Sequence, residues 1–169
     1  FAPPYDFRPY RLGKKIEAGA QFVQSQYCFD VPMFREYMKK VVDLGYAEKC
    51  FILAGVGPMA SAKTAKWIRS NVPGIHIPDS VITRLEGAQD QKKEGKQLCI
   101  DIINEVKEIE GVSGVHVMAY RQEEYVAEIV HDSGVLKGRQ PWKREANPVD
   151  QLVAERIERT REGVEQNQQ

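Results

Sequence analysis

The chain lacks an excess of charge of one sign and a hydrophobic run long enough to cross a bilayer. Lysine plus arginine number 24, and aspartate plus glutamate also number 24. No field of one sign is therefore available to capture nucleic acid non-specifically, and DNA or RNA binding is not favoured. The longest apolar run, CFILAGVGPMA, is well short of the roughly 20 residues that span a membrane. We expect a soluble, cytoplasmic protein.

Motifs that define common catalytic and metal sites are also missing. The sequence has no Ser-His-Asp grouping, no phosphate-binding loop of the GxGxxG or GxxxxGK[ST] type and no CxxC pair. Cys28, Cys50 and Cys99 are odd in number and lie among apolar residues, so we expect buried thiols rather than disulfides or a zinc site. The chain opens on FAPPYDF without an initiator methionine, which suggests that it is cut from a longer protein.

The residues that are present predict an alternation of helices and strands. Strands are expected at residues 21–29, 49–57, 74–79 and 114–120, from apolar or β-branched runs bounded by turn residues. Helices are expected at residues 8–18, 30–45, 61–71, 80–109 in two pieces, and 122–135, from apolar stripes with helical spacing. Four consecutive βα units with short connections predict an α/β fold with a parallel sheet. Such units suit half of an eight-unit barrel or an open doubly wound sheet, and the pattern does not choose between them.

A separate segment follows at residues 136–169. It begins with a polar linker broken by prolines and continues as a charged helix with a narrow apolar stripe. We interpret it as an appendage that docks on the domain or on a partner subunit, with Trp142 as an anchor. A solvated tail is the alternative.

Polar residues around the first strand are the main candidates for ligand binding. Gln24 and Gln26 share one face of the strand by its period of two, and an amide both donates and accepts, as recognition of a heterocycle edge requires. Arg11, Lys14 and Lys15 have the spacing that places three cations on one helix face, suited to a diphosphate. Interior amides bonded to backbone, and a solvated helix face, are the alternatives.

Other candidates carry weaker signals. Arg121 follows the fourth predicted strand, where a ligand would lie in a parallel fold, and could bind a carboxylate. The Gly55 to Pro58 stretch, GVGP, would let backbone approach a ligand closely. His76 and His116 lie among apolar neighbours and are interpreted as core histidines bonded to backbone, with a role as ligand or base as the alternative.

Several of these motifs together resemble the second half of a methylenetetrahydrofolate reductase. KKIEAGAQFVQSQYCFD, ILAGVGPMASAKTAKWI, IHIPD and GVHVMAY occur in the family's order and spacing, and the K-x-x-A-G-A-x-F-x-x-x-Q block is the most specific. The resemblance covers residues 1–135 and implies the C-terminal half of a TIM-type (β/α)8 barrel. Residues 136–169 would then be a C-terminal helical extension outside it.

The resemblance also implies roles for residues of the first block. Lys14 and Lys15, and Arg11 where other members can have asparagine, match the basic positions that hold the phosphates of FAD. Gln26 matches the glutamine that lies over the flavin and contacts the folate pterin or the nicotinamide.

Three positions depart from the family pattern. HVMAYRQ stands where many members read HFYTLNR, so Arg121, implied to bind substrate, is offset by one. Thr64 and Ile68 stand where some members place a glutamine and a phenylalanine for substrate packing.

The implied activity is the flavin-dependent reduction of 5,10-methylenetetrahydrofolate to 5-methyltetrahydrofolate in one-carbon metabolism, with NADH, NADPH or another reduced donor. The glutamate that acts as general acid in the family and the aspartate beside the flavin belong to the first half of the barrel, so no catalytic residue is assigned to this chain. We therefore expect a fragment, or a chain completed by another polypeptide, as a homo-oligomer or with a redox partner subunit. An inactive barrel half that serves assembly, and a doubly wound nucleotide-binding domain unrelated to folate, are the alternatives.

Overall fold

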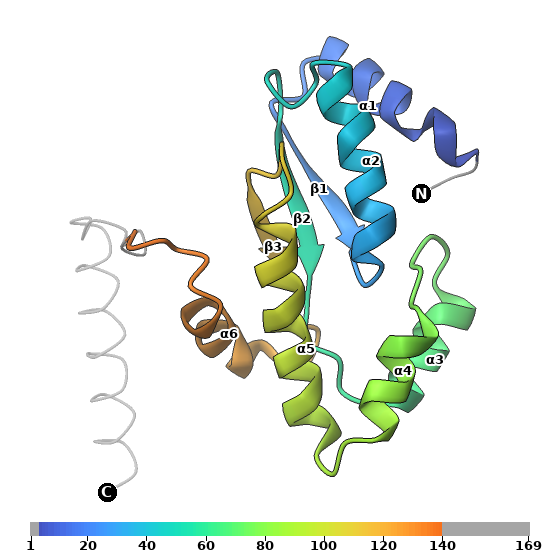
Figure 1. Ribbon diagram of the computed structural model, residues 1–169, viewed down its shortest axis with the longest axis vertical. Helices are drawn as coiled ribbons and strands as arrows, with labels where there is room; N and C mark the ends of the chain where they lie inside the picture. Colours follow the sequence, from blue (N-terminus) through green and yellow to red (C-terminus); the bar gives the residue numbers. More distant parts are fainter. Residues whose placement is uncertain (1–3, 140–169) are drawn as a thin grey trace, which may run out of the picture. The chain divides into compact units, whose positions relative to one another are not determined.

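The computed structural model describes residues 4–139, which form several helices and a small parallel sheet (Figure 1). In chain order the elements are η1 (Tyr5–Phe7), α1 (Arg8–Glu17), β1 (Phe22–Tyr27), α2 (Val31–Asp43), β2 (Phe51–Val56), α3 (Ala62–Asn71), α4 (Asp79–Glu86), α5 (Gln91–Val106), β3 (Gly114–Val117), η2 (Glu123–Tyr125) and α6 (Val126–Asp132). Within the described part of the chain, no helix is both long and apolar enough to cross a membrane. The linker and helix expected at residues 136–169 fall almost wholly outside the described residues.

The sheet has three parallel strands in the order β1-β2-β3. Helices separate the strands along the chain, so the predicted α/β class with a parallel sheet is confirmed. The count of four βα units is wrong, because residues 74–79 form no strand. β3 pairs directly with β2, with Leu53 opposite Gly114 and Val56 opposite Val117, which leaves no place for a strand between them.

The segment at residues 74–79 has the burial pattern of a strand without being one. Ile75 and Ile77 are buried and His76 between them is exposed, which is the alternation expected of a half-buried strand. Pro73 precedes the segment and Pro78 lies within it, and neither has an N–H to donate to a ladder. The segment instead joins α3 to α4 as irregular chain anchored by its two isoleucines.

Residues at the helix ends explain where α1 ends and where α2 begins and ends. The Asp30 carboxylate accepts a hydrogen bond from the Met33 N–H at 2.9 Å and so caps α2. Gly19 and Gly45 follow α1 and α2 with φ of 99° and 68°, the left-handed conformation that ends a helix at little cost for glycine. These stops fix where β1 and β2 begin.

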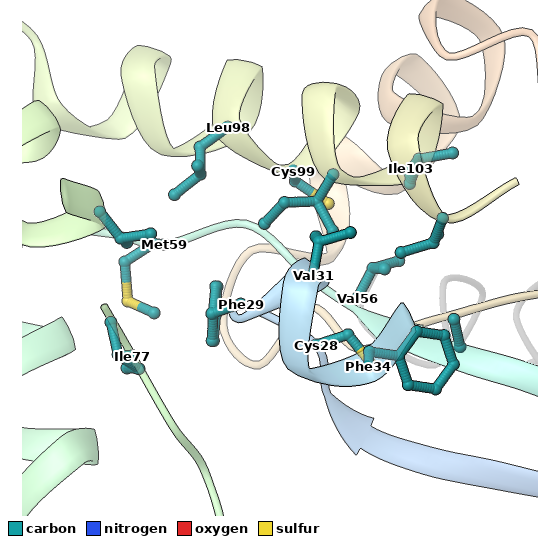
Figure 2. Close-up of a cluster of buried hydrophobic side chains, with 14 of the residues drawn as sticks. Cys28, Phe29, Val31, Phe34, Val56, Met59, Ile77, Leu98, Cys99 and Ile103 are labelled. Carbon is teal, nitrogen blue, oxygen red and sulfur yellow. The ribbon is translucent and has the colours of Figure 1, made fainter. Parts of the chain in front are cut away.

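The core lies between one face of the sheet and the helices α2 and α5, which run alongside it in Figure 1. Figure 2 shows Val31 and Phe34 of α2 near Val56 of β2, with Cys99 and Ile103 of α5 beside them. The three cysteines are buried free thiols, as predicted. Burial of these apolar side chains holds the helices on the sheet.

The opposite face of the sheet carries exposed side chains. Phe22 and Phe51 are register partners at the start of β1 and β2, and they are 59% and 67% exposed. Gln24 and Gln26 follow Phe22 on the same face and are also exposed. This face therefore changes from aromatic at the start of the strands to polar toward their ends.

Candidate functional site

A cavity of about 720 Å³ runs along β1 and reaches α1, α2, β3 and the segment before α4. Its volume is within the range of small-molecule and cofactor sites. Cationic, amide, imidazole, aromatic and thioether side chains all line it. Because β1 pairs with β2 alone among the described strands, the outer edge of β1 is open to the cavity.

The cationic wall of the cavity comes from α1. Arg11 and Lys15, one helical turn apart, line the cavity, whereas Lys14 is exposed on the same helix and does not. Another part of α1 packs against the protein, because Gly13 lies so close to Tyr46 that a Cβ there would be 2.3 Å from the Tyr46 hydroxyl oxygen. The structure thus brings together two of the three predicted phosphate-binding residues.

Arg8 adds a further cation to this wall, one turn before Arg11. Its guanidinium lies 4.1 Å from the centre of the Tyr5 ring, and that of Arg11 lies 5.7 Å from the Phe7 ring. Such cation–π contacts restrain long side chains that would otherwise be disordered in water. Tyr37 of α2 also lines the cavity, and burial raises the pKa of its hydroxyl to about 12 despite the nearby Arg8 cation, so it is a neutral donor at physiological pH.

The two glutamines of β1 both line the cavity. The Gln26 side-chain oxygen accepts a hydrogen bond from the Tyr27 N–H at 3.3 Å, which leaves its amide N–H₂ for another acceptor. The register of β1 on β2 shifts between Gln24 and Tyr27. At that irregularity the Ser25 hydroxyl, on the other face, accepts from the Gly55 N–H at 2.8 Å, so Ser25 is a structural residue that the sequence reasoning did not identify.

An aspartate–histidine pair lies where β1 leads into α2. His76 Nδ1 is 2.7 Å from Asp30 Oδ2, and both residues line the cavity. The interpretation of His76 as a core histidine is wrong, because its side chain is 57% exposed. The pairing was not detectable in the sequence, since the two residues are far apart along the chain and meet only through the fold.

His116 of β3 is half-buried and lines the same cavity. Its Nδ1 atom is buried and has no hydrogen-bond partner within residues 4–139. A buried polar atom without a partner is unusual and costs free energy. The expected backbone partner of this histidine is therefore absent from the described structure.

Arg121 is not brought to this cavity. It lies beyond β3, exposed, with a left-handed φ of 56° and its guanidinium 5.3 Å from the Tyr120 ring centre. The next residue, Gln122, is buried and donates from its side-chain amide to the Pro58 carbonyl at 3.3 Å. Gln122 was missed because nothing in its local sequence distinguishes it from a surface residue.

Thr64 and Ile68 also lie away from the cavity lining. The Thr64 N–H and hydroxyl both contact the hydroxyl of Ser61, the N-cap of α3, at 3.1 and 3.0 Å. Ile68 packs against the core. Both positions therefore support α3, and their roles toward a substrate stay predictions.

Neighbouring protein atoms fill the space beside the two glycines of the GVGP stretch. A Cβ at Gly55 would lie 2.5 Å from the Ser25 carbonyl oxygen, and one at Gly57 would lie 2.1 Å from the Met118 carbonyl oxygen. The close approach predicted at these glycines thus exists, but its partner is neighbouring backbone. Within residues 4–139, no group of three or more histidine, cysteine or acidic side chains could hold a metal ion.

Parallel strands joined through helices, with a cavity lined by cations from α1 and by amide and imidazole groups from other elements, define an α/β protein with a site of cofactor size. The sequence pattern of the methylenetetrahydrofolate reductases matches residues 5–134. The chain therefore belongs to the methylenetetrahydrofolate reductase family. The alternative of a nucleotide-binding domain unrelated to folate is wrong.

Individual relatives are distant. The chain is 25% identical over 157 residues to a probable methylenetetrahydrofolate reductase (NADPH) of Caenorhabditis elegans, covering 88% of this chain and 23% of the relative. It is 27% identical over 131 residues to the 5,10-methylenetetrahydrofolate reductase of Salmonella typhimurium, covering 75% of this chain and 43% of the relative. The chain thus spans less than half the length of either relative.

A solved structure shares the fold. It is an uncharacterized protein from Clostridium thermocellum described as binding two copies of 5-methyl-5,6,7,8-tetrahydrofolic acid. It superimposes with a TM-score of 0.58 at 19% identity, covering 77% of this chain and 48% of that chain. The three parallel strands and their helices are consistent with part of a reductase-like barrel.

Proposed function

We propose that this chain is the FAD- and folate-binding part of a reductase that converts 5,10-methylenetetrahydrofolate to 5-methyltetrahydrofolate. Family membership supports the reaction. The observation that carries the proposal for this chain is that Arg11 and Lys15, assigned by resemblance to the FAD diphosphate, and Gln26, assigned to a position over the flavin ring, line one cavity. NADH, NADPH or another reduced donor would supply the electrons, and the expected cytoplasmic location stays a prediction.

The donor set of the cavity fits FAD. Arg11 and Lys15 would neutralise a diphosphate from the α1 wall, since guanidinium and ammonium groups bind phosphate oxygens with charge-assisted hydrogen bonds. Gln26 would lie over the flavin and donate its amide hydrogens to a ring carbonyl of the folate pterin. When bound, FAD supplies the hydride-transfer chemistry.

The residues of this chain would bind and orient rather than transfer protons. By resemblance, the glutamate that protonates the pterin nitrogen and the aspartate beside the flavin belong to the preceding half of the barrel. Arg121, offset by one from the family's arginine, would reach the folate tail only if the loop after β3 turned its side chain toward the ligand. We therefore propose that turnover requires the missing half, in the same or another polypeptide.

Binding of FAD to the full chain tests the proposal. Quenching of flavin fluorescence on titration should report a complex, and Lys15→Ala should weaken it roughly ten- to a hundredfold, the value of one charge-assisted contact. Lys14→Ala is the matched control, because Lys14 is a lysine of the same helix outside the cavity lining. A chain that takes up no FAD would overturn the proposal, and equal losses in the two variants would overturn the assignment of Lys15.

Gln26→Ala separates the two ligands. It should weaken binding of 5-methyltetrahydrofolate, or donor-dependent turnover in a completed enzyme, while FAD is retained. If Gln26→Ala instead lost FAD and left folate binding unchanged, the assigned ring contact would be wrong.

A second candidate function is assembly, as a barrel half that completes a partner. The exposed aromatic pair Phe22 and Phe51 favours it, because large apolar side chains side by side on an open sheet face are typical of an interface. A homo-oligomer or a redox partner subunit would cover them. If the C-terminal extension makes this contact, deletion of residues 136–169 should abolish the complex on size-exclusion chromatography, and an unchanged elution volume would count against that route.

A further inference from the structure

The Asp30 carboxylate is held at both of its oxygens. Oδ1 accepts the Met33 N–H at 2.9 Å, which caps α2, and Oδ2 lies 2.7 Å from His76 Nδ1. The Asp30 side chain is 17% exposed, whereas that of His76 is 57% exposed. An exposed imidazole is therefore bonded to a carboxylate that the α2 cap holds in place.

The backbone that carries His76 is also fixed. Ile75 and Ile77 on either side are 8% and 1% exposed and belong to the core. The Ile77 carbonyl accepts from Arg69 Nη1 at 3.5 Å, and Arg69 also pairs with Asp79 at 2.6 Å. With both neighbours pointing into the core, the imidazole points the other way, to the cavity that Gln26 also lines.

This geometry sets which nitrogen of His76 meets a ligand. A carboxylate on Nδ1 favours the tautomer with hydrogen on Nδ1, so that Nε2 carries the lone pair in the neutral ring. Nε2 has no hydrogen-bond partner within the described part of the chain. Gln26 offers the complementary group, because its oxygen is taken by the Tyr27 N–H and its amide hydrogens are left to donate.

We propose that His76, positioned by Asp30, is a second ligand-binding residue of the cavity, which together with Gln26 recognises the lactam edge of a bound heterocycle. A lactam edge presents an N–H beside a carbonyl oxygen, so it donates to His76 Nε2 and accepts from the Gln26 amide. Flavin and pterin rings both carry such an edge. The inference rests on the proposed function and adds to it a residue that the family resemblance does not assign.

Binding to the full chain is measured with two probes, FAD and 5-methyltetrahydrofolate, by fluorescence quenching and by calorimetry. His76→Phe keeps a flat ring without the nitrogens and should weaken at least one probe about tenfold, the value of one hydrogen bond to a ligand. A loss confined to 5-methyltetrahydrofolate identifies the pterin edge, in agreement with the assignment of Gln26, whereas a loss confined to FAD would mean that His76 and Gln26 do not share one ligand. His76→Gln, which restores a polar group at similar reach, should recover part of the affinity.

A matched control is available in His131, whose Nδ1 lies 2.9 Å from Asp132 but which lies on α6 outside the cavity lining. His131→Phe should leave both affinities unchanged. Asp30→Asn keeps an amide oxygen able to cap α2 but loses the acceptor for His76. It should weaken the same probe as His76→Phe, and the double variant should be no weaker than His76→Phe alone.

The outcomes distinguish the role of the Asp30–His76 pair from the proposed function of the chain. If the wild-type chain, His76→Phe and Asp30→Asn all bind a probe with equal affinity, the role of the pair is overturned and the proposed function stays intact. Additive losses in the double variant overturn the positioning role of Asp30. A wild-type chain that binds neither probe overturns the proposed function, and the lactam recognition with it.

Discussion

Replacement of Gly57 by alanine tests how tightly the ends of the three strands are packed. An added Cβ would lie 2.1 Å from the Met118 carbonyl oxygen and 2.6 Å from a ring carbon of Tyr27. Carbon–oxygen contacts are normally no shorter than about 3.3 Å, so that carbonyl must move by about 1.2 Å. The same carbonyl accepts the Tyr27 hydroxyl at 2.9 Å, and the Met118 N–H donates to the Val56 carbonyl at 2.7 Å.

The expected cost follows from these contacts. Overpacking costs about 1–3 kcal/mol, and the loss or distortion of one hydrogen bond adds about 1 kcal/mol. Gly57→Ala should therefore lower the free energy of unfolding by about 2–4 kcal/mol. Urea unfolding followed by tryptophan fluorescence and far-ultraviolet circular dichroism measures it as a lower midpoint at constant slope.

Gly87→Ala provides the control in the same assay. Gly87 has a helical φ of −76°, and the nearest atom to an added Cβ lies 3.5 Å away, so alanine should be neutral or stabilise by up to about 1 kcal/mol. A Gly57→Ala variant within about 0.5 kcal/mol of wild type would refute the packing argument. Because Met118 also lines the cavity, Gly57→Ala should weaken ligand binding as well.

Three further outcomes are expected. Tyr27→Phe removes the hydroxyl bond between strand ends and should cost about 1 kcal/mol in the same urea titration; a cost above that of Gly57→Ala would contradict this assignment. Met38→Ala, at a fully buried position of α2, should cost about 2–5 kcal/mol, and Leu44→Ala, 37% exposed at the helix end, clearly less. Burial raises the pKa of the Cys99 thiol from 9.0 to about 12, so from pH 9 upward the unfolded chain loses a proton that the native chain keeps, and the free energy of unfolding should fall by up to about 1.4 kcal/mol per pH unit. Urea titrations at several pH values measure this slope, which Cys99→Ala should reduce.

The parts of the fold that depend on local chemistry were predictable from the sequence. The α2 helix is specified by Asp30 at its start, an apolar stripe and Gly45 after its end, all within one short segment. The prediction of a strand at residues 74–79 was wrong because Ile75 and Ile77 both point into the core, with an exposed residue between them, just as in a half-buried strand. Whether such a segment becomes a strand depends on hydrogen-bond partners elsewhere in the chain. The edge of β2 that could have paired with it is paired with β3 instead.

In the candidate site, too, features of the local sequence were predictable and features that depend on tertiary contacts were not. Helical spacing predicted three cations on one face of α1, but only Arg11 and Lys15 line the cavity, because the face that a helix turns to a cavity depends on its tertiary contacts, such as that of Gly13 with Tyr46. His76 was interpreted from its apolar neighbours alone. The local sequence explains its partner Asp30 only as the cap of α2, and the second use of that carboxylate arises from a tertiary contact.

The open edge of β1 explains why Gln26 differs from Gln24 although both face the same way. Unpaired N–H and C=O groups at a strand edge need partners, and at the register shift of β1 the Gln26 side-chain oxygen satisfies the N–H of Tyr27. Its amide is thereby oriented with the oxygen toward the strand and the hydrogens away from it. A side chain held in this way loses less conformational entropy when it binds a ligand than a free surface glutamine would. The strand irregularity therefore preorganises Gln26 for the ring contact that we propose, and no bond within residues 4–139 does the same for the Gln24 side chain.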